Sequence, residues 1–212
     1  MGIGKKGFTL VEIIVSLAIM TIVAGAVGAF VVAGNNSYMR GNKELTLQEE
    51  AQLTANQMID LIIDVEKGIS FSNLTDQEAV DVDGNVAKDV NGMEVTNASV
   101  SELRLINNDN SYMIRWQGGA GADYADANQV YLYEVTNTKD GEGKVVVGDF
   151  DAAKPALMAE HVSSFSVDLS ELDKRKVVLN MIFTYQDKSY DISETIKLRN
   201  DLSSEPSSIY SW

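Results

Sequence analysis

Glu12 is the only charged residue in an apolar run that extends from Phe8 to Ala33. An ionised carboxylate inside a membrane-spanning helix is costly, so such a residue is more often functional than accidental and needs a partner. The chemistry that Glu12 suggests is charge pairing in an apolar environment. The alternative is that the carboxylate snorkels to the membrane interface near the end of its helix.

Most other site chemistry has little support in this sequence. The chain has no cysteine and one histidine, His161, which excludes thiolate sites, a His-based triad and a multi-histidine metal cage. We interpret His161 as an ordinary structural or surface residue. With 17 basic against 31 acidic residues and a net charge of −14, direct nucleic-acid binding is not expected. We expect no enzymatic activity and no cofactor.

The only pattern that resembles a metal site is Asp81-x-Asp83-x-Asn85, which is similar to the start of a calcium-binding loop. The pattern then fails, because Val86 stands where glycine is required and Gly92 where a bidentate glutamate is required. We therefore expect no metal site and interpret these residues as loop charges in solvent.

The element that must position Glu12 is a long apolar helix. Residues 8–34 exceed the roughly 20 residues that span a bilayer core, and the run is longer than the core of a cleaved secretory signal. Lys5 and Lys6 precede it and no basic residue follows until Arg40. The positive-inside rule therefore predicts a single-pass membrane protein with a cytoplasmic N-terminus and residues 35–212 outside.

Residues 5–12, Lys-Lys-Gly-Phe-Thr-Leu-Val-Glu, resemble the N-terminal signal of type IV pilins and type II secretion pseudopilins. The resemblance implies that a prepilin peptidase removes residues 1–7, cutting between Gly7 and Phe8, and methylates the new amine. Lys5 and Lys6 are then the basic part of the leader. The family further implies that the Phe8 amine of one subunit pairs with Glu12 of the next and sets the subunit register. Partners would be this peptidase, other pilin or pseudopilin subunits and the membrane, and the mature chain would enter a pilus or pseudopilus.

Residues 35–69 continue as an amphipathic helix, because apolar residues recur at spacings of three and four. The apolar face comprises Leu47, Ala51, Ala55, Met58, Ile62, Val65 and Ile69. We expect this helix to end at Lys67-Gly68. Weak helix formers at 34–37 and 41–42 are expected to kink it, and Gly25 with Ala29 would allow close helix approach in the membrane.

Residues 70–201 form the expected extracytoplasmic β-rich domain, followed by a mobile tail at 202–212. Residues 70–100 are polar and acidic and suggest a connection with one hairpin around Asp83-Gly84-Asn85. Alternating segments that predict strands are 102–106, 112–116, 129–135, 144–147, 162–169, 177–185 and 190–198. The glycine-rich residues 118–122 lack a phosphate-binding pattern and predict a loop.

These elements predict an α+β fold in which a long N-terminal helix packs on one antiparallel β-sheet, as in pilins. The last strands, closing at Lys197-Leu198-Arg199-Asn200, resemble the larger minor pilins of the PilW and GspJ type. That resemblance, with the length of the chain, favours a minor subunit that initiates or caps a filament. The alternative is a major pilin or a membrane-anchored surface adhesin.

Overall fold

The structure, a computed structural model, describes residues 7–89, 91–95, 98–118 and 127–202. The chain divides between Leu45 and Thr46 into two compact units, each of which is described by itself. Lys5 and Lys6, residues 119–122 of the expected glycine-rich loop and the tail from residue 203 lie outside the described residues.

Helix α1 comprises Leu10–Ile63 and contributes to both units. It runs through 34–37 and 41–42 without a break in its helical assignment, so these weak helix formers do not end it. Each glycine costs about 1 kcal/mol of helix stability relative to alanine. The cooperativity of the helical turns on either side outweighs this cost.

The expected end of the helix at Lys67-Gly68 was wrong. After Ile63 the backbone leaves the helix to bond with distant segments: the Arg199 N–H donates to the Ile63 carbonyl at 3.0 Å and the Lys67 N–H to the Ile106 carbonyl at 2.9 Å. Gly68 then opens the first strand. Long-range pairing overrode the local helical periodicity, so Val65 and Ile69 lie beyond the helix.

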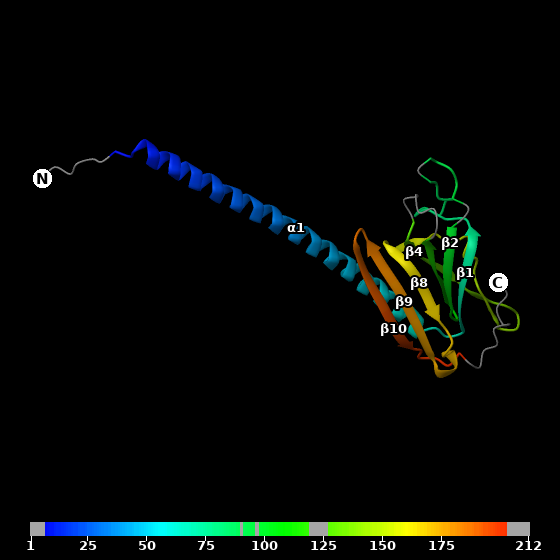
Figure 1. Cartoon of the computed structure of the whole chain (residues 1–212). Helices are drawn as coiled ribbons and strands as arrows, with labels where there is room; N and C mark the ends of the chain where they lie inside the picture. The colour runs from blue at the N-terminus through cyan, green and yellow to red at the C-terminus, as the bar shows by residue number, and fades with distance from the viewer. Residues whose placement is uncertain (1–6, 90, 96–97, 119–126, 203–212) are drawn as a thin grey trace. The chain divides into compact units, whose positions relative to one another are not determined.

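All β-pairing in the described residues is antiparallel, and it forms two main sheets rather than the expected single one (Figure 1). The five-stranded sheet has the order β1-β2-β3-β4-β7, with β1 (Gly68–Gln77), β2 (Ala98–Ile106), β3 (Asn110–Gly118), β4 (Gln129–Thr136) and β7 (Ala156–Ala159). The three-stranded sheet has the order β10-β9-β8, with β8 (Val162–Asp168), β9 (Lys176–Tyr185) and β10 (Lys188–Lys197). A short 3₁₀ helix, η1 (Leu172–Lys174), precedes β9.

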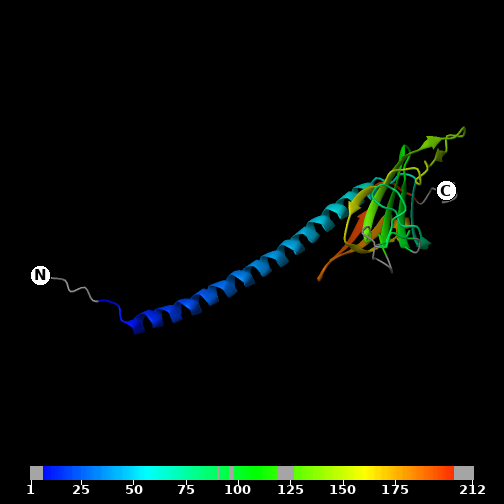
Figure 2. The same ribbon diagram turned by 90° about the horizontal axis from the view of Figure 1, so that it is seen from above.

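A third pairing joins β5 (Thr138–Lys139) to β6 (Val145–Val146) as a small hairpin, which Figure 2 shows in yellow-green.

The turn of this hairpin has a hydrogen-bonding pattern that recurs at residues 81–85 and 89–93. Asp140 accepts the backbone N–H groups two and four residues ahead, and Gly143 adopts a φ of +81°. Asp81 with Gly84 and Asp89 with Gly92 repeat both features. The expected hairpin at 83–85 is thus confirmed as a turn closed by a Val80–Val86 bridge.

The core of the second unit lies where the helix meets the inner faces of both sheets. The helix contributes the expected face, and Leu47, Ala51, Ala55, Met58 and Ile62 are all buried. The five-stranded sheet contributes Leu103, Leu105 and Ile114, and the three-stranded sheet Phe165, Leu179, Met181 and Phe183. The predicted α+β class, a long helix packed on antiparallel strands, is confirmed.

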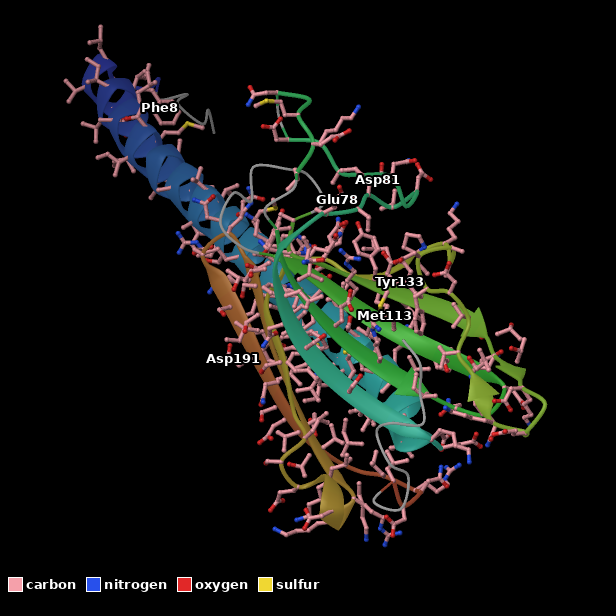
Figure 3. The ribbon with its side chains drawn as sticks, turned by 90° about the vertical axis from the view of Figure 1, so that its right-hand side faces the viewer. Phe8, Glu78, Asp81, Met113, Tyr133 and Asp191 are labelled. Carbon is pink, nitrogen blue, oxygen red and sulfur yellow. The ribbon has the colours of Figure 1, made fainter. Side chains whose placement is uncertain are left out.

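The outer face of the five-stranded sheet is also covered. Met113 on β3 and Tyr133 on β4 are buried in a second cluster with Phe150, which comes from the segment after β6 (Figure 3). Burial, the largest influence, raises the pKa of Tyr133. Beside this cluster Glu102 receives a 2.8 Å hydrogen bond from the Arg104 guanidinium. The segment after β6 therefore supplies part of the packing on this face.

Candidate processing and assembly site

Gly7 and Phe8 lie immediately before α1 in exposed, non-helical chain. The Phe8 side chain is 81% exposed (Figure 3), and nothing lies within 4 Å of the position that a Gly7 Cβ would occupy. A protease needs access to a peptide bond that is not held in a helix. The geometry at Gly7–Phe8 therefore suits cleavage at that bond.

Glu12 closes a reciprocal cap with Thr9 at the start of the helix. The Glu12 N–H donates to the Thr9 hydroxyl at 3.3 Å, and the Thr9 N–H donates to the Glu12 Oε2 at 3.3 Å. The Thr9 hydroxyl also lies 3.4 Å from the same carboxylate oxygen. This is a capping box, a threonine followed three residues later by a glutamate, which satisfies backbone N–H groups that a helix start leaves unpaired.

The side chain of Glu12 lies beside an open concavity of about 300 Å³ on the helix surface. The residues that line it are Phe8, Glu12, Ile13, Ser16, Leu17 and Met20. Four of these are apolar, and the Ser16 hydroxyl is already bonded to the Glu12 carbonyl at 2.7 Å. Within this lining Glu12 is the single charged group, so a cation that approached it would meet one carboxylate in apolar surroundings.

The apolar residues of the first unit from Phe8 to Leu45 are all exposed in the isolated chain. The large apolar residues from Leu10 to Val32 are each more than half exposed. Among the described residues, α1 is the one helix long and apolar enough to cross a membrane, and it lies near the N-terminus. Gly25 likewise has nothing near the position of an added Cβ. The first part of the helix thus offers its whole circumference to lipid or to other chains.

Comparison with known proteins addresses this same segment. Residues 4–28 match the family model described as the prokaryotic N-terminal methylation motif. The motif supports a pilin- or pseudopilin-type subunit, processed by a prepilin peptidase and assembled with other pilin-type subunits. Proteins with this motif are structural subunits rather than enzymes. No curated protein and no solved structure matches the chain.

The acidic pattern at Asp81 forms a closed turn in the structure. Asp81 Oδ1 accepts the N–H groups of Asp83 and Asn85, both at 2.9 Å. The bond from the Asn85 backbone, the largest influence, lowers the pKa of Asp81. Its carboxylate therefore acts as a cap for its own loop.

His161 takes part in a contact that sequence reasoning did not foresee. Its Nδ1 lies 3.2 Å from Glu50 Oε2 on α1, and Glu50 Oε1 accepts the Glu160 N–H at 2.6 Å. The ring packs edge-on against Tyr185 at 4.5 Å. The expectation of a structural histidine fits these contacts, which join the helix to the turn between the two sheets.

Sequence reasoning also missed the role of Thr9. The signal was present, since a threonine followed three residues later by glutamate before an apolar run is a known helix start. The partner of His161 had no comparable signal, because Glu50 lies more than a hundred residues away in sequence.

Proposed function

We propose that this chain is a minor, filament-initiating or tip subunit of a type IV pilus-like filament or a type II secretion pseudopilus. In this proposal residues 1–7 are a leader removed by prepilin peptidase between Gly7 and Phe8. Residues 8–34 anchor the chain in the membrane, with Lys5 and Lys6 on the cytoplasmic side. Residues 35–201 lie outside, where α1 ends at Ile63 and the β-rich domain follows.

The observation that carries the proposal is the position of Glu12. It is the one charge in the apolar run, four residues after the proposed new N-terminus and inside the matched motif. Cleavage would create an α-amine at Phe8, which is a cation at neutral pH. A buried ion pair contributes little net stability but specifies register well. Glu12 is therefore proposed to receive the Phe8 amine of a neighbouring subunit.

In the capping box, Thr9 competes with the neighbour's amine for the Glu12 carboxylate. In the uncut chain the Glu12 carboxylate is bonded to Thr9. A neighbouring amine would bring a full positive charge to the carboxylate, an attraction that the uncharged N–H and O–H donors of Thr9 do not supply. Glu12 is expected to hold the helix start before assembly and to exchange that contact for the neighbour's amine during it.

The decisive test of processing is the mass of the N-terminal peptide of membrane-purified protein. A peptide that begins at Phe8 and carries one additional methyl group is the expected result. A peptide that begins at Met1 or Gly2, in a host with an active prepilin peptidase, would overturn the proposal and leave a signal-anchored surface domain.

Replacing Glu12 tests register. Glu12→Val should insert in the membrane normally, because it removes a costly charge, and should lose assembly. Breaking one partner of a buried pair costs about 3–5 kcal/mol, so incorporation into sheared filaments should fall by at least about a hundredfold. Thr9→Ala keeps the carboxylate and removes only the hydroxyl that accepts the Glu12 N–H, so its incorporation should fall far less. Normal incorporation of Glu12→Val would refute the register role.

Copy number separates the minor subunit from the alternatives. The length of the chain and its resemblance to larger minor pilins support scarcity in sheared filaments, which quantitative mass spectrometry would measure. A chain that dominates the filament would instead be a major pilin. A processed chain that remains on the cell surface outside any filament would be an anchored adhesin.

A further inference from the structure

The two sheets of the second unit end in long edge strands of very different composition. Both β1 and β10 contain ten residues, and in the described residues each pairs with one neighbour only, β2 and β9 respectively. An edge strand presents unpaired backbone N–H and C=O groups that can pair with another chain, and proteins usually block such edges with charge.

Strand β10 is blocked in this way. Lys188, Asp191 and Lys197 lie along it, and the exposed Asp191 is labelled in Figure 3. Glu194 lies between Ile192 and Ile196 on the side that packs into the core, because strand residues two apart share a face. A charged residue on the inner side of an edge strand prevents another strand from docking there.

Strand β1 lacks these features over most of its length, and its one charged residue, Asp76, lies next to its end. From Gly68 to Thr75 it has no charged residue and no proline. Ile69 and Phe71 pack against the core but stay partly exposed, so their outer flanks are apolar surface that an added strand would cover. On the opposite side Ser70 and Ser72 are small and would not obstruct an approaching backbone. Figure 3 shows this strand, in turquoise, bordering the sheet.

We propose that the edge of β1 from Gly68 to Thr75 is a docking site for an extended, uncharged strand of a neighbouring pilin-type subunit. The inference rests on the proposed function, which requires contacts with other subunits. An uncharged edge segment offers no opposite charge to a charged strand. Such a strand would lose hydration of its charged groups on docking without gaining an ion pair. Backbone pairing would provide affinity, and apolar side chains beside Ile69 and Phe71 would provide selectivity.

Two matched variants test this site in the full-length chain, in cells that assemble filaments. Ser72→Lys places a positive charge on β1, and Thr195→Lys places the same charge on β10. Ser72 and Thr195 are both exposed in the wild-type chain. Ser72→Lys should reduce incorporation about tenfold, equivalent to about 1.4 kcal/mol, and Thr195→Lys should not. Thermal unfolding midpoints of both should match that of the wild type, which separates lost docking from misfolding.

Crosslinking then identifies the occupant. Because the chain has no cysteine, Ser72→Cys and Thr195→Cys each offer one attachment point for a benzophenone maleimide. Adducts with another subunit should form from position 72 and be scarce from position 195. An adduct within the chain that disappears when residues 203–212 are deleted would overturn the proposal and identify the chain's own C-terminal segment as the occupant.

The remaining outcomes are distinct. Equal incorporation of Ser72→Lys and wild type would overturn this inference and leave the proposed function intact. A wild-type chain that is never cleaved at Gly7 and never found in filaments would overturn both.

Discussion

Helix α1 has two parts that share a backbone conformation and differ in everything around it. Up to Leu45 its apolar side chains are exposed on all sides, whereas from Thr46 onward one face is buried against two sheets. The second part has the stripe of an amphipathic helix, and the first is predominantly apolar on all sides from Leu10 to Ala33. A helix that is apolar on every side must be covered by lipid or by other helices. One continuous helix therefore serves two environments, and its composition alone marks the change between them.

A pair of methionine variants gives the largest contrast between the two parts. Met58 is fully buried and Met39 is 51% exposed on the same helix. Met58→Ala should reduce the free energy of unfolding of the second unit by about 2–5 kcal/mol through lost packing and a cavity. Met39→Ala should stay within about 0.5 kcal/mol. Urea unfolding of the full chain in detergent micelles measures both, and equal losses would contradict the division of the helix.

Two glycine variants should have smaller effects on stability, and the two effects should be opposite in sign to each other. Gly41 lies in the helix of the first unit with nothing within 4 Å of an added Cβ, so Gly41→Ala should stabilise the local helix by about 0.5–1 kcal/mol. Gly143 has a φ of +81° in the β5–β6 turn, so Gly143→Ala should destabilise that hairpin by about 1–2 kcal/mol. Hydrogen exchange of the two segments reports each change. A stabilised hairpin would show that the turn does not require a left-handed residue.

Acid should loosen two turns of the second unit, with the smallest effect of the three. Backbone hydrogen bonds lower the pKa values of Asp81 and Asp89, led by those from Asn85 and Met93. A lowered folded-state pKa contributes stability above the unfolded value near 3.9, and that stability is lost as the pH falls through the folded value. The two turns should therefore hold from neutral pH to about pH 4 and loosen below it.

Amide NMR of Asn85 and Met93 would follow this transition, since both N–H groups donate to the titrating carboxylates. Asp81→Asn is the matched control, because an asparagine oxygen accepts the same bonds without titrating. A pH transition at Asn85 that persists in this variant would show that another group causes it.

The sequence predicted the parts of the fold that depend on local periodicity. The apolar spacing from Leu47 to Ile62 identified the buried helix face, and the alternating segments 102–106, 112–116, 177–185 and 190–198 were correctly predicted as strands. Strand β1 was missed because Ser and Asn dilute its apolar residues. Its pairing with β2 lies about thirty residues further along the chain and leaves no local trace. Strand β7 is four residues long, too short for an alternating pattern.

The separation into two sheets could not be inferred for a related reason. Strand order depends on which strands the helix brings together, and β8 begins a new sheet only after the turn at His161. The candidate site was different, because its residues are contiguous. Gly7, Phe8 and Glu12 remain predictions as site residues. The Thr9 cap, in contrast, could be predicted from residues 9–12 alone.

The recurrent Asp-x-x-Gly turn has a practical consequence. In the β5–β6 hairpin the Asp140 carboxylate and Gly143 close the loop with atoms from within the turn. Its tip, residues 141 and 142, supports no bond to the rest of the domain among the described residues. Such a turn is a suitable graft point for an epitope tag or a reporter peptide, which would be displayed without disturbing the core that folds around Met58.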